Sequence, residues 1–497
     1  MVVAAQVGRD LVEAVRRLCT TVQEEQRRRA GLSPVEEVEA ETGVVQHDVA
    51  GVAHAASANL LDDHKSSRDG GPWRIAWSGT ARYRSPVISV GEALRAVLDA
   101  TPVLGTERVL LSAAAGRVAA ADVTSARAVP AAANSAMDGF AVRAADVATA
   151  PARLRLIGVA PAGTLLDTAV VPGTAAKIFT GSVVPDGADT VVRVEDTEER
   201  DGTVIVQVAV RAGANVRLAG EDIEPGAVVV PAGGLLGAAD VGVLASIGRA
   251  TVTVHRRPRV AILSTGAELV EVDETPGPGQ VVNSNAYTLA AAVAEAGGEP
   301  TVLPIVRDRL EDVRERLTAA ADADVVLSSG GVSVGEFDFV KEALDALGVE
   351  RHFWKVAQKP GKPLIFGTRG QHLFFGLPGN PVSALVCFLV YVRPALRRLS
   401  GHRRLHLPAV DAVLEAPLKK ASKLTEFVRV ALSRGATGWV ARPWPTQSSG
   451  VLTSLGGGAG LLVGPASVDV LEPGRSYPVL VPSPETLACE QLGSEFA

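Results

Sequence analysis

The sequence predicts a multidomain protein of α/β plus β structure: a central doubly wound parallel-sheet domain, two β-rich domains, and a region of helical and extended segments. Its 497 residues leave room for three or four domains with separate cores. From Arg259 onward strand and helix patterns alternate, which is typical of a parallel sheet covered by helices. Before and after that stretch, short β-branched runs are broken by glycine and proline, which indicates separate β domains.

The N-terminal part differs from the rest of the chain. Residues 1–85 lack a sustained apolar period, and we expect a flexible or loosely helical extension. A helix is predicted to start at Ser89, because Ser89 and Glu92 form a capping-box pattern ahead of apolar residues at helical spacing. In the first β-rich domain, the runs 189–194 and 203–210 predict strands.

The central domain is predicted from its alternating apolar runs. We expect strands at 260–263, 301–306 and 324–327, and helices at 286–296, 310–321 and 339–347. In such sheets, ligands bind at the carboxyl ends of the strands. Three predicted loops fall there, and they carry Glu268, Asp308 and a glycine-rich turn.

That turn, Ser329-Gly-Gly-Val-Ser-Val-Gly-Glu-Phe-Asp338, is typical of a phosphate cradle. Successive glycines let backbone N–H groups converge on one anion, and the following helix adds its positive N-terminal dipole. A carboxylate such as Asp338 beside a bound phosphate indicates a divalent cation between them. The alternative is a tight strand-to-helix connection with a solvated Asp338, and the turn alone leaves both interpretations open.

Two further turns could bind anions on the same side of the sheet. Arginine outnumbers lysine 40 to 9, yet Lys359 and Lys362 lie together on a proline-stiffened turn that suits a polyphosphate. A solvated basic turn is the alternative. In Gly376-Leu-Pro-Gly-Asn-Pro-Val-Ser383, Asn380 is placed to cap a helix and Pro381 to begin it, and the exposed helix N-terminus is a second candidate oxyanion site.

Asp138 and Asp222 each lie in a turn beside glycine, outside the predicted sheet domain. The commoner role for such residues is to cap local N–H groups. A functional role requires that the fold bring them to the anion site.

Composition excludes several classes of protein. A net charge of −6 argues against a nucleic-acid binder, and three scattered cysteines form neither a disulfide framework nor a thiolate metal site. The apolar run 384–391 is too short to cross a bilayer and predicts a buried helix. The N-terminus lacks the order of a signal peptide, so we expect a cytoplasmic protein that binds neither nucleic acid nor membranes.

The catalytic motifs of several enzyme classes are also missing from the sequence. It contains no Walker-type phosphate loop, no Gly-x-Ser-x-Gly elbow and no paired His/Cys zinc pattern. General acid or base chemistry would therefore rest on carboxylates, with a metal such as Mg²⁺ to neutralise phosphate charge.

Six motifs, in order along the chain, resemble those of a known family. They are Asn134-Ser-Ala-Met-Asp-Gly139, Gly220-Glu-Asp-Ile223, Ser264-Thr-Gly-Ala-Glu-Leu269, Ser328-Ser-Gly-Gly-Val-Ser-Val-Gly335, Lys359-Pro-Gly-Lys-Pro363 and Gly376-Leu-Pro-Gly-Asn-Pro-Val-Ser383. The set is similar to the molybdopterin molybdenumtransferases, the molybdenum insertases related to the C-terminal domain of gephyrin. The resemblance runs from about Pro86 to the C-terminus.

The resemblance implies a transferase that converts adenylylated molybdopterin and molybdate, with Mg²⁺, to molybdenum cofactor and AMP. It implies a homodimer whose active cleft lies between the sheet domain of one subunit and the β domain of the other. The implied domains are a dimerisation region (86–123 and 227–258), a β-rich domain (124–226), an α/β molybdopterin-binding domain (259–407) and a C-terminal β domain (408–497). Candidate protein partners are the molybdopterin adenylyltransferase and apo-molybdoenzymes.

Site residues are implied at the positions that match the family's motifs. Acidic residues with implied catalytic roles are Asp138, Asp222, Glu268, Asp308 and Asp338. Asp138, Asp222 and Glu268 are also the implied ligands of Mg²⁺ or molybdate. Implied substrate-binding residues are Thr180, Gly330, Gly331, Ser333, Lys359, Lys362, Pro378, Pro381 and Ser449.

Other functional classes stay open at this point. The chain could be a pterin-binding carrier without catalysis, or a dimeric scaffold like gephyrin. An adenylyltransferase that acts one step earlier would share the sheet-domain motifs but lack the flanking β domains. The sequence does not distinguish molybdate from tungstate, and it does not identify the acceptor enzymes.

Overall fold

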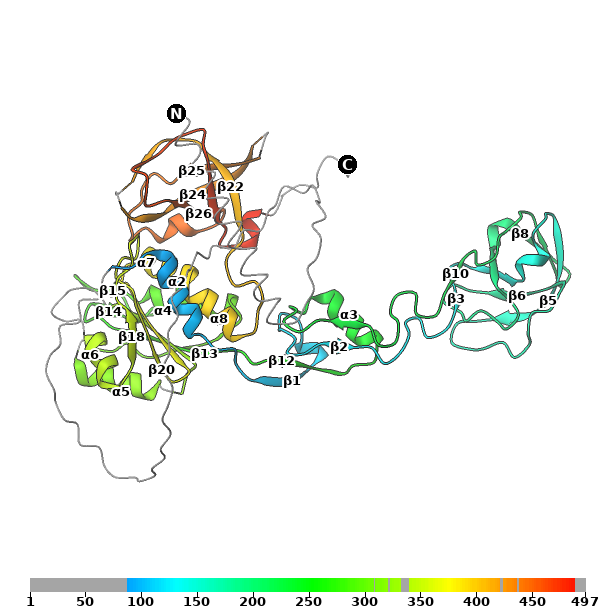
Figure 1. The fold of residues 1–497 in the computed structure, drawn as a ribbon, viewed down its shortest axis with the longest axis horizontal. Coiled ribbons are helices and arrows are strands. Elements are labelled where there is room, and N and C mark those ends of the chain that lie inside the picture. Colours follow the sequence, from blue (N-terminus) through cyan, green and yellow to red (C-terminus); the bar gives the residue numbers. More distant parts are fainter. Residues whose placement is uncertain are drawn as a thin grey trace, which may run out of the picture. The chain divides into compact units, whose positions relative to one another are not determined.

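The computed structural model describes residues 87–307, 309–320, 322–331, 339–420, 423–435 and 438–487. The predictions for residues 1–85, Asp308, Ser333 and Asp338 therefore lie outside the described residues. The chain divides into two compact units. One comprises residues 105–255, and the other contains the residues that precede and follow this segment (Figure 1).

Helix α2 (Val90–Ala100) opens the described part and confirms the predicted capping box. The Glu92 N–H donates to Ser89 Oγ at 3.2 Å, and the Ser89 N–H donates to Glu92 Oε2 at 2.7 Å. These bonds satisfy backbone donors that the helix itself leaves free. The apolar face of α2 then packs into the core of the sheet domain through Leu94 and Val97.

The central sheet has six strands, of which four are parallel as predicted. Their spatial order is β16 (Glu299–Val302), β13 (Arg259–Ser264), β17 (Val325–Ser329), β21 (His372–Leu377), β20 (Ile365–Arg369) and β18 (Glu350–Phe353). The strands from β16 to β21 are parallel, whereas β20 pairs antiparallel with both β21 and β18. The wholly parallel sheet that we predicted is therefore corrected: only Gly370 and Gln371 join β20 to β21, which is too short for a parallel crossover.

Helices cover both faces of this sheet, which confirms the doubly wound arrangement (Figure 1). Along β13, Val260 and Ile262 face one core, and Ala261 and Leu263 face the other. The first core is covered by α2, α4 (Ser284–Glu295), α7 (Pro381–Cys387) and α8 (Arg393–Leu399), and the second by α5 (Leu310–Ala319) and α6 (Phe339–Ala346). The alternation follows from the period of two in a strand.

Strand β16 begins earlier than the predicted 301–306. It pairs with β13 through residues 299–302, and each of its side chains is exposed. An edge strand tolerates Pro300, whose missing N–H would interrupt a central strand. The apolar residues from Leu303 to Val306 mark the loop that follows rather than the strand itself.

Residues 105–255 contain two groups of strands. One sheet has the order β7 (Thr190–Arg193), β4 (Gly139–Val142), β6 (Thr174–Ile178), β5 (Ala152–Ala160), β9 (Thr203–Val206) and β8 (Thr197–Arg200). The remaining pairs are β1 (Thr106–Leu110) with β12 (Thr251–His255), β2 (Val123–Thr124) with β11 (Val228–Val230), and β3 (Asn134–Ser135) with β10 (Val216–Arg217). Helix α3 (Ala238–Ser246) contributes Leu244 to a core shared with β11 and β12. The predicted strands 189–194 and 203–210 are present, the second ending at Val206.

The C-terminal residues form a sheet that closes on itself, in accord with the predicted second β domain. The closed order is β24 (Thr425–Gly435), β25 (Gly438–Pro443), β22 (Ala409–Leu414), β28 (Ser476–Leu480) and β26 (Ala459–Gly464), with β26 pairing back to β24. The turn that carries Lys359 and Lys362 is called the lysine turn below. Its strand β19 (Gln358–Lys359) pairs with β24. Two short pairs complete the described sheets: β14 (Leu269–Val270) with β15 (Val281–Val282), and β23 (Leu418–Lys419) with β27 (Val470–Leu471).

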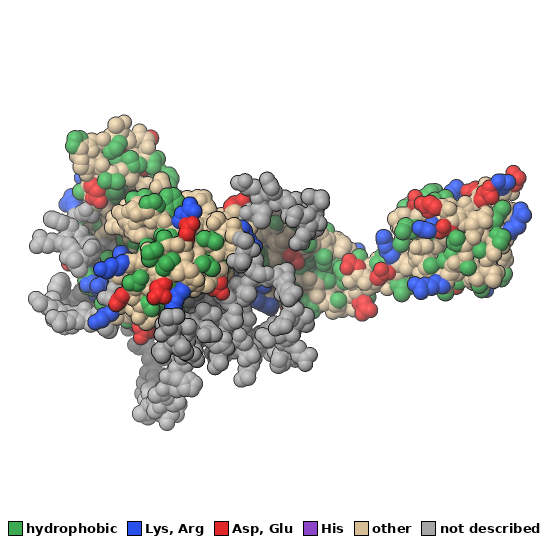
Figure 2. Space-filling model, turned by 90° about the horizontal axis from the view of Figure 1, so that it is seen from above, with side chains coloured by type: hydrophobic (Ala, Val, Ile, Leu, Met, Phe, Trp, Pro, Cys, Tyr) green, Lys and Arg blue, Asp and Glu red, His purple; other side chains and the backbone are tan. Residues whose placement is uncertain are grey.

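The apolar run 384–391 is buried, as predicted. It is shared by α7 and a π-helical segment, Phe388–Val392, all of whose residues are buried. Across the described ranges, no helix has both the length and the apolar character needed to cross a membrane. On the face seen in Figure 2, Lys and Arg side chains are interspersed with Asp and Glu side chains.

Candidate functional site

A cavity of about 420 Å³ lies where β13, β17 and β21 end. Its polar walls come from the loop after β13 (Thr265, Glu268), the start of α4 (Asn283, Ser284, Asn285), the end of β17 (Ser329, Gly330) and the turn before α7 (Gly379, Asn380, Pro381). The carboxyl edge of the sheet is where ligands bind in doubly wound folds. The structure therefore brings the predicted Glu268, Gly330 and Pro381 into one cavity.

The turn after β17 requires its two glycines. Gly330 and Gly331 have φ angles of 90° and 66°, in the left-handed region that favours glycine. A Cβ on Gly330 would lie 2.6 Å from the Thr265 carbonyl oxygen, and one on Gly331 would lie 2.6 Å from Val340 Cγ2. The N–H of Gly330 donates to the Leu377 carbonyl at 3.1 Å, so this N–H already has a partner within the fold. Gly330 thus shapes the wall of the cavity through close packing.

The amide of Asn285 ties the two turns of the cavity together. Its Nδ2 donates to Ser329 Oγ at 2.8 Å and to the Gly379 carbonyl at 2.7 Å. Both protons of Nδ2 are therefore used, which leaves Oδ1 as the acceptor available to a ligand. A single side chain from the first turn of α4 fixes the separation between the ends of β17 and β21.

Two buried polar atoms at the cavity have no hydrogen-bond partner among the described residues. They are Thr265 Oγ1 and Asn283 Nδ2, in residues that are 4% and 2% exposed. Leaving such a group unpaired costs about 1–3 kcal/mol. Because both residues line the cavity, a polar ligand can supply the missing partners.

Glu268 provides the carboxylate of the cavity. Its side chain folds over Gly266, where an added Cβ would lie only 2.8 Å from Oε1. Proteins usually hold Mg²⁺ through one or two carboxylates together with phosphate oxygens of the substrate. One carboxylate beside hydroxyl and amide oxygens fits that kind of ligand set.

The lysine turn connects the sheet domain with the C-terminal sheet. Lys359 and Lys362 are both exposed, and Lys359 Nζ lies 3.6 Å from Glu426 Oε1 on β24. The Lys362 carbonyl accepts a hydrogen bond from the Val356 N–H at 2.9 Å, which closes the turn. The contact with Glu426 thus holds the Lys359 side of the turn, and the hydrogen bond from Val356 holds the Lys362 side.

The predicted Ser449 lies beside the first turn of α7. Its carbonyl accepts from the Val382 N–H at 3.1 Å, one residue after Pro381. Pro378 is buried between β21 and the Gly379 turn. Asn380 occupies the N-cap position of α7 as predicted, but its side chain makes no capping hydrogen bond, so its capping role is corrected to a backbone one.

Arg429 is a residue of this region that the sequence interpretation missed. It is 1% exposed, and its guanidinium donates to Ser454 Oγ at 2.9 Å and to the carbonyls of Thr446 and Ser448 at 3.2 and 2.9 Å. Burial lowers the pKa of Arg429. These bonds order the loop that carries Ser449. The signal in the sequence was an arginine inside an apolar strand pattern, where a charge is rarely buried without partners.

Asp138 and Thr180 form a pair within residues 105–255. The backbone N–H and the hydroxyl of Thr180 donate to Asp138 Oδ1 at 2.7 and 2.9 Å, and they lower the pKa of the Asp138 carboxyl. Asp222 is also exposed, and its N–H donates to the Val129 carbonyl at 3.0 Å. The predicted acidic turns are thus ordered, and Asp138 is held in its ionised form.

The predicted metal ligands Asp138, Asp222 and Glu268 are divided between the two units of the chain. Within the part of the chain that the structure describes, no three His, Cys, Asp or Glu side chains form a group able to hold a metal ion. The predicted ligand set therefore remains a prediction.

Three family profiles match the chain in order. "MoeA N-terminal region (domain I and II)" matches residues 88–248, "Probable molybdopterin binding domain" matches 261–398, and "MoeA C-terminal region (domain IV)" matches 411–481. The second profile spans the whole sheet edge that forms the cavity.

Curated relatives and solved structures agree with these profiles. The chain is 42% identical over 329 residues to the molybdopterin molybdenumtransferase of Nostoc sp., covering 64% of this chain and 76% of the relative. It is 34% identical over 425 residues to that of Bacillus subtilis, covering 83% and 96%. Two crystal structures of the molybdopterin biosynthesis MoeA protein from Pyrococcus horikoshii align with TM-scores of 0.70 and 0.69, at 32% and 29% identity, each over 80% of this chain and 100% of the solved chain.

Proposed function

We propose that this chain, which belongs to the MoeA family of molybdopterin molybdenumtransferases, inserts molybdenum into adenylylated molybdopterin. The predictions of this family and of a transferase are confirmed. In the proposed reaction, water cleaves the phosphoanhydride of the adenylylated substrate and AMP leaves. The two pterin sulfurs then bind molybdenum from molybdate, and one molybdate oxygen leaves as water with the two thiol protons. The product is molybdenum cofactor.

The observation that carries this proposal is the cavity at the ends of β13, β17 and β21. It combines Glu268 with two buried polar atoms, Thr265 Oγ1 and Asn283 Nδ2, that lack partners among the described residues. A pterin carries amide-like donors and acceptors, and its phosphate carries acceptors. A cavity with unmet hydrogen-bonding groups on a rigid rim suits such a ligand.

In this proposal the residues of the chain bind and orient the substrates. Thr265, Asn283 and Asn285 hold the polar edge of the pterin substrate, while Lys359 and Lys362 attract molybdate or phosphate oxygens. Glu268 would hold Mg²⁺, which would supply positive charge against the charge that develops on the phosphoanhydride oxygens. Pro378, Pro381, Ser449, Ser333 and Gly331 complete the proposed substrate site, and Asp308 and Asp338 its proposed acidic residues.

We place the reaction in the cytoplasm and assign it to a homodimer. Asp138, Asp222 and Thr180 of one subunit then serve the cavity of the other subunit, where the two acidic side chains order metal or water. Deprotonated Asp138 suits that role, because two donors from Thr180 stabilise its negative charge. Contact with the adenylyltransferase and with apo-molybdoenzymes would pass the labile pterin between proteins.

The test is AMP release from adenylylated molybdopterin by the purified full chain, with and without molybdate and Mg²⁺. We expect release that depends on molybdate, and we expect Asp138→Asn to lower the rate about a hundredfold, the scale of a lost acid–base or charge contribution. Asp167→Asn is the matched control, because Asp167 is an exposed carboxylate of the same unit. Tight substrate binding without release under any condition would instead identify a carrier or scaffold.

A further inference from the structure

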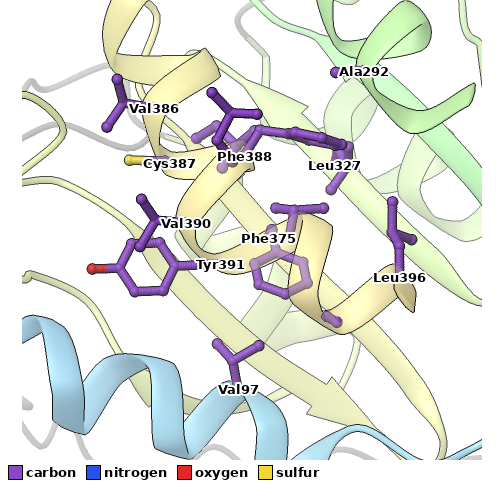
Figure 3. Packing of buried hydrophobic residues seen from close by; sticks show 14 of the residues in the cluster. Val97, Ala292, Leu327, Phe375, Val386, Cys387, Phe388, Val390, Tyr391 and Leu396 are labelled. Carbon is purple, nitrogen blue, oxygen red and sulfur yellow. The ribbon is translucent and has the colours of Figure 1, made fainter. Parts of the chain in front are cut away.

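A buried polar group stands behind the lysine turn. Gln358 is 0% exposed, and it lies immediately before Lys359, in the short strand β19. Its side chain points away from the exposed lysines, toward Cys387 of α7 and Tyr391 of the π-helical segment. Figure 3 shows Cys387 at the end of α7, Tyr391 on the π-helical segment that follows, and Val97 on α2 in the same core.

The orientation of the Gln358 amide follows from its neighbours. Nε2 lies 3.2 Å from the Pro360 carbonyl and 3.1 Å from the Gly361 carbonyl, and both of these atoms can only accept. The amide nitrogen must therefore face them, and Oε1 must face the Tyr391 hydroxyl, which donates to it. Burial raises the pKa of Tyr391 well above its ordinary value, so this donor keeps its proton.

Two hydrogen bonds of Gln358 Nε2 reach the centre of the lysine turn, and a third reaches Cys387 Sγ at 3.4 Å. Pro360 and Gly361 are the two residues between Lys359 and Lys362. Gly361 has a φ of 86°, and a Cβ there would collide with Cys387 Sγ, so the backbone sits directly against α7. On its other side the turn is paired with β24 through Gln358 and Lys359. The backbone between the two ammonium groups is thus held between a helix and a strand.

We propose that Gln358 and Tyr391 are positioning residues, which act together to fix the spacing of Lys359 and Lys362 for a tetrahedral oxyanion. This inference rests on the proposed function for the identity of that anion, molybdate. Without the Tyr391 hydroxyl, Gln358 Oε1 is left buried without its donor, one of the bonds that hold the amide is lost, and the turn gains freedom. A preformed pair of cations binds an anion without the entropy cost of ordering the loop first.

The test uses Tyr391→Phe and Gln358→Met in the full chain, with Val97→Ala as the matched control. Val97 belongs to the same buried core but contributes no polar group. All assays are run at a temperature where each variant is folded. Three quantities are measured: kcat and KM for molybdate in AMP release, and the rate of amide hydrogen exchange in the segment 355–363.

We expect Tyr391→Phe to raise the KM for molybdate at least about threefold, with kcat changed less than about twofold. Exchange in 355–363 should become faster in this variant but not in Val97→Ala. A double variant with both Tyr391→Phe and Gln358→Met should resemble either single variant, because the effects of substituting residues that act as a unit do not add. If Tyr391→Phe does not fold, the same changes in KM and in exchange are expected of Gln358→Met, and their absence there would overturn the inference.

An unchanged KM and unchanged exchange in a folded Tyr391→Phe would overturn the inference, and so would equal changes in Val97→Ala. If the wild-type chain releases no AMP, the proposed function fails by itself. The exchange comparison would then still decide whether Gln358 and Tyr391 order the turn.

Discussion

Asp324 shows how one carboxylate joins two segments that are distant in the sequence. Its side chain is 7% exposed, and it accepts from Arg256 Nη1 and Nη2 at 2.7 and 2.6 Å and from the Arg259 N–H at 2.8 Å. Burial raises the pKa of Asp324, but these hydrogen bonds outweigh it, and the net pKa lies below the ordinary value. The carboxylate thus anchors the segment that leads into β13.

This arrangement predicts a pH-dependent stability. Because the folded-state pKa is lowered, the stabilisation is present above the unfolded pKa of about 3.9 and is lost as the pH falls through the lower folded value. Asp324→Asn should lower the free energy of unfolding by about 3 kcal/mol at pH 7, the scale of a broken buried ion pair. Urea unfolding at several pH values measures the difference in free energy of unfolding between the wild type and Asp324→Asn. This difference should stay constant from pH 7 to pH 5 and narrow only below about pH 4. A difference that narrowed near neutral pH would contradict this assignment.

Single residues of the site were predictable where a local pattern marks them. Glu268 and Gly330 follow predicted strands, and the carboxyl ends of parallel strands share one edge. Pro381 begins a predicted helix. Asn285 could not be assigned its role, because its amide bridges Ser329 and Gly379, which are adjacent only in the folded sheet. Gln358 was missed for the same reason, since its partner Tyr391 lies in another element.

At the scale of elements, α2 combines a local signal with a tertiary contact. The capping box at Ser89 was predictable, because both partners lie within one helical turn. We expect Ser89→Ala to lower the free energy of unfolding by about 1 kcal/mol, while Ser89→Thr retains most of it. Denaturant unfolding of the three proteins is the measurement. Equal stability of Ser89→Ala and the wild type would show that Leu94 and Val97 hold the helix in place without its cap.

The predicted strands and helices were most accurate where apolar residues are buried on both sides. Strand β17, all of whose residues are buried, lies close to its predicted range for this reason. Helix α6 lies close to its range because its buried residues Val340, Ala343 and Leu344 repeat at helical spacing. Strand β16 was displaced because an exposed edge strand lacks an apolar pattern. The antiparallel hairpin of β20 and β21 was missed although Gly370 and Gln371 alone connect them, a spacing that already excludes a parallel crossover.

At the scale of the whole molecule, the proposed homodimer predicts complementation between inactive variants. Asp138→Asn and Glu268→Gln subunits are co-expressed with different tags, and AMP release is measured. If each site uses Asp138 from one subunit and Glu268 from the other, a mixed dimer has one intact site, and random mixing restores about a quarter of the sites. If isolated mixed dimers recover no AMP release, each site uses Asp138 and Glu268 from the same subunit.

The β1–β12 pair has a consequence for how the chain is organised. Thr106 and His255 are direct partners in this antiparallel pair, so the unit of residues 105–255 begins and ends at neighbouring points. Every strand that it contains pairs within the unit. It is an insertion whose ends already meet, an arrangement in which a domain can be exchanged without breaking its host. The gene segment between the codons of Gly105 and His255 is therefore a natural cassette for building chimeras with relatives.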